Sequence, residues 1–214
     1  MEKIRGATSA PNIDTQHPLH AAIQRRCQIL AVQNIEPVIR LAHRIAGPIN
    51  IQSRIIFDHE LVLIVRGTGE LAFAGQTFAF GPRDLFVIPP FSPHEFRSHE
   101  ACEPCEHVAV HFDLAADVPR RRGLLQARKP YHVALTQGLV FPLHLAVLHD
   151  DPIIHGMDRI VEMRGSVDGL DQLASRMELL EILLLLLKRQ RRAGQARRTA
   201  QGNCLPPSSQ KMQK

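Results

Sequence analysis

The chain has 214 residues but no Trp, only one Tyr and only four Cys. The aromatic side chains that most often stack on sugar rings are therefore scarce, although nine Phe remain. Four unevenly placed Cys are too few for a disulfide scaffold, so free thiols are expected. Cys102 and Cys105 form a lone CxxC that has zinc-like spacing with His107, but no second pair completes it. We interpret this CxxC as a hairpin turn with exposed thiols.

Long hydrophobic runs are also absent. The longest run, 179–187, contains Glu181, whereas about 20 apolar residues are needed to span a bilayer. The N-terminus contains no apolar segment of the kind found in secretory signals. These absences predict a cytoplasmic protein without a membrane partner.

Acidic residues are missing from the C-terminal end. Residues 188–214 hold eight Lys and Arg and no Asp or Glu, which leaves 18 basic and 21 acidic residues in 1–187. The formal net charge of +5 therefore belongs to the tail. The rest of the chain shows no electrostatic footprint for nucleic acid. We interpret the tail as a solvated end that binds an acidic partner weakly at most.

Residue patterns divide the chain into four zones. Residues 1–27 are predicted to be a flexible arm, 28–135 a strand-rich barrel, 136–193 a helical dimerisation region and 194–214 a disordered basic tail. Strands are predicted at 61–65, 70–73, 76–80, 84–88, 94–97 and 106–113, with Gly and Pro turns between them. Short strands punctuated in this way favour an antiparallel sandwich or barrel. The expected fold class is therefore mainly β with a C-terminal helical part, α+β overall.

The sharpest pattern lies in the predicted C-terminal helix. Apolar residues recur at alternating steps of three and four, as in a coiled-coil seam: Leu170, Leu173, Met177, Leu180, Leu184 and Leu187. A second apolar stripe on another face contains Leu179, Ile182, Leu183 and Leu186. We predict a dimerisation helix with one face on its own domain and the other on a partner chain. A single helix buried in a monomer is the alternative.

Three segments carry a family resemblance when they are taken in order. They are VRGTGEL at 65–71, GPRDLFVIPPFSPH at 81–94 and HVAVHFD at 107–113. Together they resemble the N-terminal cupin-like ligand-sensing and dimerisation domain of the AraC family of transcription regulators. The resemblance implies a cupin-like jelly-roll barrel followed by a helical dimerisation element, a small-molecule effector and a homodimer.

The same segments make physical sense as turns. Gly67 and Gly69 allow the positive φ of a tight hairpin. Asp84 is placed to accept backbone N–H bonds in the turn that follows Gly81. These features describe scaffold and identify no ligand.

Candidate ligand contacts come from strand alternation and from the resemblance. In 106–113, alternation places His107, Ala109 and His111 on one face, which is the more polar one and suits a barrel cavity. The resemblance implies ligand contacts at Arg54, Phe96, His107 and Ala109, where Arg54 offers forked donors to a carboxylate or to hydroxyls. The ordinary alternatives are a surface charge for Arg54, a core residue for Phe96 and hydrogen-bonded strand histidines.

Metal-binding cupins share four metal ligands: two histidines and a Glu in a first motif, and one His in a second motif. Glu60 and His94 match the last two, but the first-motif histidines are missing, with Arg54 and Ile55 nearby instead. Because a catalytic metal usually takes at least three protein ligands, we expect no metal cofactor, no catalytic residue and no enzyme activity. The alternative is a small metal-dependent cupin enzyme of the dioxygenase or isomerase type that uses Glu60, His94 and His107.

Regulators of the AraC family carry two helix-turn-helix units after the dimerisation helix. Residues 193–214 contain no pattern of that length. We therefore expect the sensing and dimerisation half of an AraC-like regulator, which reaches DNA only through a missing or separate helix-turn-helix domain. A degenerate remnant without a ligand is a third hypothesis.

Overall fold

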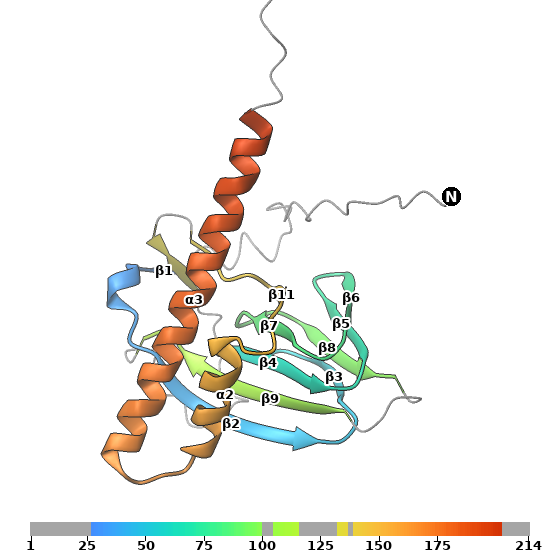
Figure 1. The fold of residues 1–214 in the computed structure, drawn as a ribbon, viewed down its shortest axis with the longest axis vertical. Helices are drawn as coiled ribbons and strands as arrows, with labels where there is room; N and C mark the ends of the chain where they lie inside the picture. The colour runs from blue at the N-terminus through green and yellow to red at the C-terminus, as the bar shows by residue number, and fades with distance from the viewer. Residues whose placement is uncertain (1–26, 100–104, 116–131, 137–138, 203–214) are drawn as a thin grey trace, which may run out of the picture.

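The computed structural model of the chain describes residues 27–99, 105–115, 132–136 and 139–202 (Figure 1). Nine of its strands form two antiparallel sheets. The five-stranded sheet has the order β11 (His144–Ala146), β7 (Asp84–Ile88), β4 (His59–Arg66), β9 (Glu106–Asp113), β2 (Val38–Ala46). The four-stranded sheet has the order β3 (Asn50–Arg54), β8 (His94–Ser98), β5 (Gly69–Phe73), β6 (Gln76–Phe80). A separate parallel pair joins β1 (Cys27–Leu30) to β10 (His132–Leu135), and η1 (Val32–Asn34) follows β1.

The expected fold class is confirmed, because an antiparallel β barrel is followed by two C-terminal helices, α2 (Pro152–Glu162) and α3 (Gly169–Gly202). The strands β6, β7 and β9 have the predicted bounds, and β4, β5 and β8 differ only at their ends. Two features differ from the prediction. β11 lies in the zone predicted to be helical and pairs with β7, and α3 continues past residue 193, where the helical zone was expected to end. The predicted arm lies outside the described residues except for Cys27.

The turns between strands follow the sequence prediction in two of three places. Gly67 has a φ of +91°, as expected, and the Oδ2 of Asp84 accepts the Gly81 N–H at 2.7 Å. Gly69 does not have a positive φ. It is required for a steric reason instead, because a Cβ there would lie 2.3 Å from the carbonyl oxygen of Arg97 on β8.

The CxxC prediction needs correction at its second cysteine. Cys105 is buried in the barrel core rather than exposed, and a Cβ added at Gly67 would lie 2.2 Å from its Sγ. The close approach of the Gly67 backbone therefore covers this thiol. Cys102 lies outside the described residues.

An apolar inner core fills part of the space between the two sheets. It contains Val62, Ile64, Phe86 and Ile88 from the five-stranded sheet and Leu71, Phe80 and Phe96 from the four-stranded sheet. The three Phe rings meet edge-on or tilted, with centroids 5.8–6.4 Å apart, which is a favourable geometry for aromatic pairs. The polar groups of the candidate site share this interior.

The helices cover the outer face of the five-stranded sheet (Figure 1). Asp151 caps the N-terminus of α2: its carboxylate accepts the Ile153 N–H at 3.0 Å and pairs with Arg189 of α3 at 2.7 Å. The two helices approach closely at Gly156, where a Cβ would lie 3.1 Å from the side chain of Ile182. This end cap and this close contact fix how α2 and α3 lie against each other.

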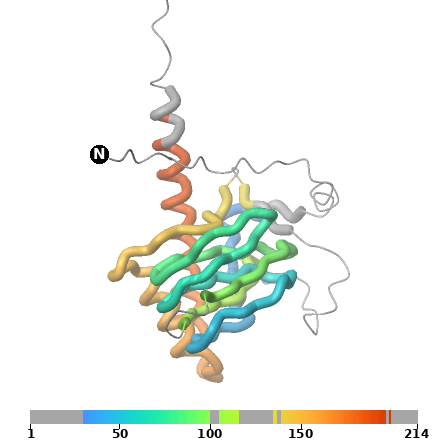
Figure 2. Tube along the Cα trace, turned by 90° about the vertical axis from the view of Figure 1, so that its right-hand side faces the viewer, coloured from blue at the N-terminus to red at the C-terminus, as the bar shows by residue number. Residues whose placement is uncertain are grey.

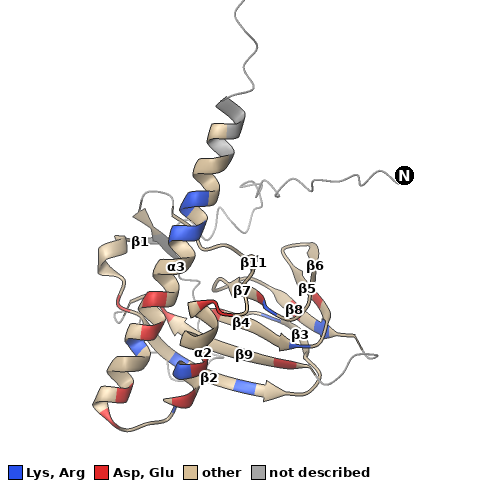
Figure 3. Ribbon diagram, in the orientation of Figure 1, with Lys and Arg blue, Asp and Glu red and all other residues tan. Residues whose placement is uncertain are grey.

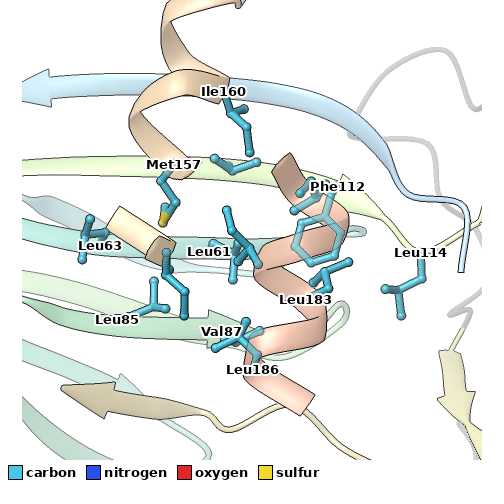
Figure 4. Close-up of a cluster of buried hydrophobic side chains, with 14 of the residues drawn as sticks. Leu61, Leu63, Leu85, Val87, Phe112, Leu114, Met157, Ile160, Leu183 and Leu186 are labelled. Carbon is cyan, nitrogen blue, oxygen red and sulfur yellow. The ribbon is translucent and has the colours of Figure 1, made fainter. Parts of the chain in front are cut away.

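A larger outer core joins these helices to the sheet (Figure 4). Its sheet side consists of Leu61, Leu63, Leu85, Val87, Val108, Val110 and Phe112, and its helix side includes Ile153, Met157, Ile160, Leu179, Ile182, Leu183, Leu186 and Leu187. Strand β9 therefore has two buried faces, one against the helices and one toward the barrel interior. A strand buried on both faces needs apolar residues on at least one of them, and 106–113 has them on the helix side.

The C-terminal part of α3 extends beyond the two sheets (Figures 1 and 2). Charge is unevenly distributed along this helix (Figure 3). Its acidic residues are Asp171, Glu178 and Glu181, and the basic run that begins at Lys188 and includes Arg191 follows them. None of the helices within the described residues is both long and apolar enough to cross a bilayer.

Candidate functional site

The predicted polar face of β9 points into the barrel interior. His107 lies opposite Ile64 of β4, and His111 lies opposite Glu60 of the same strand. Ala109, between the two histidines, is fully buried. Because Ile64 belongs to the inner core, the row His107, Ala109, His111 faces the space between the sheets.

A second group of polar side chains meets this row from the strands β3, β4 and β8. The Nη2 of Arg54 donates to both carboxylate oxygens of Glu60 at 2.9 Å, and its Nε donates to the Nε2 of His94 at 3.2 Å. Glu60 is only 2% exposed, and His94 is equally buried. The Arg54 guanidinium therefore lies against the two residues that the sequence proposed as weak metal ligands.

The hydrogen bonds of His94 determine its tautomer. Its Nδ1 lies 2.9 Å from the carbonyl oxygen of Ser92, which can only accept, so Nδ1 carries the proton. Its Nε2 is then the acceptor for Arg54. Burial lowers the pKa of His94, and the nearby Arg54 charge acts in the same direction. The ring is therefore neutral at physiological pH.

His111 is in the opposite state. Its Nδ1 lies 3.1 Å from Asp58 and its Nε2 lies 3.2 Å from Glu60, so both ring nitrogens donate to carboxylates. Burial opposes the charged form, but the two hydrogen bonds and charges outweigh burial and raise the pKa of His111 to about 9. For Glu60 burial favours the neutral acid, yet the bond to His111 and the Arg54 charge together lower its pKa. These residues form a charged network inside the barrel.

Two further histidines border this network. The ring centroid of His43 on β2 lies 5.8 Å from that of His107 and 6.3 Å from that of His111. Burial and the His111 charge lower the pKa of His43, and burial and His43 lower the pKa of His107. The Nδ1 of His107 is buried and has no hydrogen-bond partner among the described residues.

This donor set does not fit a resident metal ion. Within the part of the chain that the structure describes, no three His, Cys, Asp or Glu side chains come together in a metal-binding arrangement. Glu60 and His94 both bond to Arg54, whose guanidinium would compete with a cation for the same lone pairs. The zinc-like spacing of the CxxC with His107 is also unsupported, because Cys105 packs beside Gly67 in the inner core.

The residues predicted to contact a ligand all lie between the two sheets. Arg54 is part of the charged network, Phe96 belongs to the inner core, and His107, Ala109 and His111 form the β9 row. Phe96 lies beside His94, with ring centroids 6.2 Å apart. Their role as ligand contacts stays a prediction. A shallow hollow of about 460 Å³ over β3 and β8 shares only Phe96 with them, so it does not define this site; it is lined by Asn50, Ile51, Gln52, Glu95, Phe96, Arg97 and Ser98.

Sequence reasoning missed two members of the site. Asp58, two residues before Glu60, lies 3.1 Å from the Nδ1 of His111, and His43 lies on β2, opposite Ala109. Strand alternation would have indicated His43, since Leu41, His43 and Ile45 lie on the same face of β2. The sequence does not single out β2 because its other face carries Arg40 and Arg44 and few apolar side chains.

A comparison with protein families identifies the family of the barrel and the helices. The family of AraC-like ligand binding domains matches residues 55–187, which is more than half of the chain. The chain belongs to this family. The matched region of the AraC-like domain starts next to Arg54 and includes Glu60, His94, the whole of β9 and α2, and α3 as far as Leu187.

Several cupin structures match only about a third of this chain. A cupin superfamily protein from Desulfitobacterium hafniense DCB-2 is 17% identical, with a TM-score of 0.29 over 34% of this chain and 63% of its own. A salicylate 1,2-dioxygenase from Pseudaminobacter salicylatoxidans is 17% identical, with a TM-score of 0.28 over 33% and 19%. An oxalate decarboxylase variant from B. subtilis is 18% identical, with a TM-score of 0.30 over 38% and 22%. No curated protein matches the chain.

The predicted dimerisation residues of the AraC-like domain divide into two groups. Leu170, Leu173, Met177, Leu180 and Leu184 are exposed along one side of α3. Leu187 differs, because it is buried in the outer core of its own chain together with Leu179, Ile182, Leu183 and Leu186. The exposed row therefore ends at Leu184, whereas the sequence pattern predicted that it would continue to Leu187.

Proposed function

We propose that this chain is the small-molecule-sensing and dimerisation domain of an AraC-like transcription regulator, and that its effector binds between the two sheets. The observation that carries the proposal is the interior face of β9, where His107 and His111 flank the small Ala109 in a member of a ligand-binding family. The role is regulatory rather than catalytic, it needs no metal cofactor, and it is exercised in the cytoplasm.

The two faces of β9 suggest how binding reaches the helices. A ligand that touches His107 or His111 acts on the strand whose other face, at Val110 and Phe112, packs against α2 and α3. A polar link runs in parallel, since Arg44 of β2 pairs with Glu106 of β9 at 2.6 Å. The same Arg44 reaches Asp158 of α2 at 2.5 Å. A ligand that favours one position of β9 therefore also favours one position of the helices.

The exposed row of α3 supports self-association. Met177 is 61% exposed, whereas the other apolar side of α3, which includes Leu179 and Ile182, is buried in the outer core. A helix with apolar residues on two faces buries one in its own domain and the other in an assembly. A second copy of the chain presents the same row, so the predicted assembly is a homodimer.

The ligand proposal is tested by thermal-shift screening of the purified chain against small metabolites and divalent metals. An effector at a hundredfold excess over its Kd stabilises the fold by about 2.7 kcal/mol. Ala109→Val narrows the space between the two histidines and should abolish the shift, while Ala72→Val, a matched change at an exposed strand position, should keep it. A shift with metal ions alone would favour the metal-dependent enzyme, and no shift with any compound would contradict the sensing function.

A further inference from the structure

An unsatisfied polar atom lies inside the barrel. His107 is only 5% exposed, and its Nδ1 has no hydrogen-bond partner among the described residues. Leaving a buried polar atom unpaired costs about 1–3 kcal/mol, so native proteins rarely leave one without a partner. The atom is therefore a candidate contact for a molecule from outside the chain.

The surroundings of His107 are mainly apolar. Its cross-strand neighbours are Ile64 of β4, which is fully buried, and Ile45 of β2. Ile45 is 46% exposed, and Leu41 on the same face of β2 is 40% exposed. His43 lies between these two residues on β2 and meets the His107 ring edge to face. A molecule that reached the Nδ1 of His107 along this strand would place most of its surface against apolar side chains.

Among the described residues, the charges of the interior are already balanced. The two cationic groups, Arg54 and His111, pair with two carboxylates, Glu60 and Asp58. A charged ligand would therefore have to displace an existing ion pair in a buried environment, which is costly. The His107 ring itself is neutral, because burial and the neighbouring His43 lower its pKa.

The neutral imidazole of His107 can bond a ligand in either tautomer. The tautomer of His107 is not fixed by any partner at Nδ1, so this atom can either accept or donate. A hydroxyl can satisfy either state, whereas a carboxylate can only accept and an ammonium can only donate. Charge balance disfavours the two ionic groups, and a hydroxyl bonds the Nδ1 of His107 in whichever tautomer the ring adopts.

We propose that the effector is an uncharged molecule with an apolar body and a hydroxyl group, and that the hydroxyl bonds the Nδ1 of His107. This inference rests on the proposed sensing function and specifies its ligand class. It explains why the ligand-free barrel keeps an unpaired nitrogen where a Phe or Leu would pack without a polar penalty. The buried nitrogen lowers the stability of the free protein and is satisfied when the effector binds.

Cyclic fragments of one shape and different charge test the ligand class. Cyclohexanol, methylcyclohexane, cyclohexanecarboxylate and cyclohexylammonium are titrated into the ¹⁵N-labelled chain, and the imidazole nitrogens of His107 are followed by NMR. We expect cyclohexanol to shift the His107 resonances and to bind about tenfold more tightly than the other three, which corresponds to one buried hydrogen bond.

His107→Phe is the decisive variant because it keeps a planar ring and removes both nitrogens. The free His107→Phe protein should unfold at the same temperature as the wild type or higher, while its preference for cyclohexanol over methylcyclohexane disappears. His111→Phe is the matched control and should lower the unfolding temperature, because it breaks the bonds to Asp58 and Glu60.

Each contrary result identifies which proposal fails. Tighter binding of the carboxylate or the ammonium, with a response at His107, would overturn the ligand class and leave the sensing function intact. An alcohol preference that survives in His107→Phe, or no response of His107 to any fragment, would also overturn the assignment. Only the absence of any effector in the metabolite screen would remove the sensing function itself.

Discussion

Arg54 donates to both carboxylate oxygens of Glu60 at 2.9 Å and to His94 at 3.2 Å. These two acceptors are the residues that match the ligand positions of metal-binding cupins in the sequence. The AraC-like domain therefore holds a side-chain cation of its own against them. Arg54 is 37% exposed at its side chain, whereas Glu60 is buried, so the pair connects the barrel interior with solvent.

The Arg54–Glu60 pair should contribute to stability. Arg54→Ala leaves the buried carboxylate of Glu60 without one of its two cationic partners, and partial solvent screening keeps the expected loss to about 1–2 kcal/mol. Urea unfolding measures the free energy. The control is Arg97→Ala, which removes an exposed pair with Glu95 and should cost less than about 0.5 kcal/mol. Equal losses in the two variants would contradict the assignment.

The charged state of His111 predicts a loss of stability at alkaline pH. Its folded pKa of about 9 lies above the ordinary value of 6.5, so the folded state holds the proton more tightly than the unfolded chain. This stabilisation is fully present below pH 6.5 and is lost as the pH rises to about 9; it is on the order of 3 kcal/mol. Urea unfolding from about pH 6 to about pH 9.5 measures it.

The matched variant for this pH dependence is His111→Gln. It lacks the titrating ring, so its free energy of unfolding should change less across the same pH window, and the difference from wild type should shrink as the pH rises. A difference that stays constant would show that His111 is not charged in the folded protein.

The close contact at Gly69 predicts a strong effect of a single methyl group. In Gly69→Ala the new Cβ would lie 2.3 Å from the carbonyl oxygen of Arg97 and 2.4 Å from the ring of Phe80. The β5–β8 pairing must then shift, which should cost about 2–4 kcal/mol. Gly81→Ala is the control, because nothing lies within 4 Å of its Cβ position. Thermal unfolding of both variants checks the prediction. Similar unfolding midpoints for Gly69→Ala and Gly81→Ala would refute it.

The exposed row of α3 predicts the oligomeric state. Met177→Glu should give monomers with a folded barrel, because a charge in the middle of an apolar helix seam opposes pairing. Sedimentation velocity measures the mass, and circular dichroism checks the fold. Val167→Glu is the control: Val167 is 95% exposed and lies outside the row, so the variant should remain dimeric. If Met177→Glu remains dimeric, the exposed row of α3 is not the dimer interface.

Local patterns in the sequence were sufficient for much of the barrel. The bounds of β6, β7 and β9 and the two faces of β9 follow from period-two alternation between Gly and Pro turns, which needs no knowledge of neighbours. The turn at Asp84 follows for the same reason. Strand β2 was harder to recognise, because one face carries Arg40 and Arg44, whose partners Asp113 and Glu106 lie far along the chain.

The amino-acid sequence by itself thus determined the antiparallel strands, the polar interior row and the helix with two apolar stripes. Only the tertiary structure decided that Arg54 binds Glu60 and His94, that His111 is charged, and that Leu187 is buried in its own chain. Alternation and heptad spacing are properties of neighbouring residues. Charge state, ion pairing and burial depend instead on which distant strands and helices become neighbours, and that is decided when β3 pairs with β8, β4 pairs with β9, and α3 packs on the sheet.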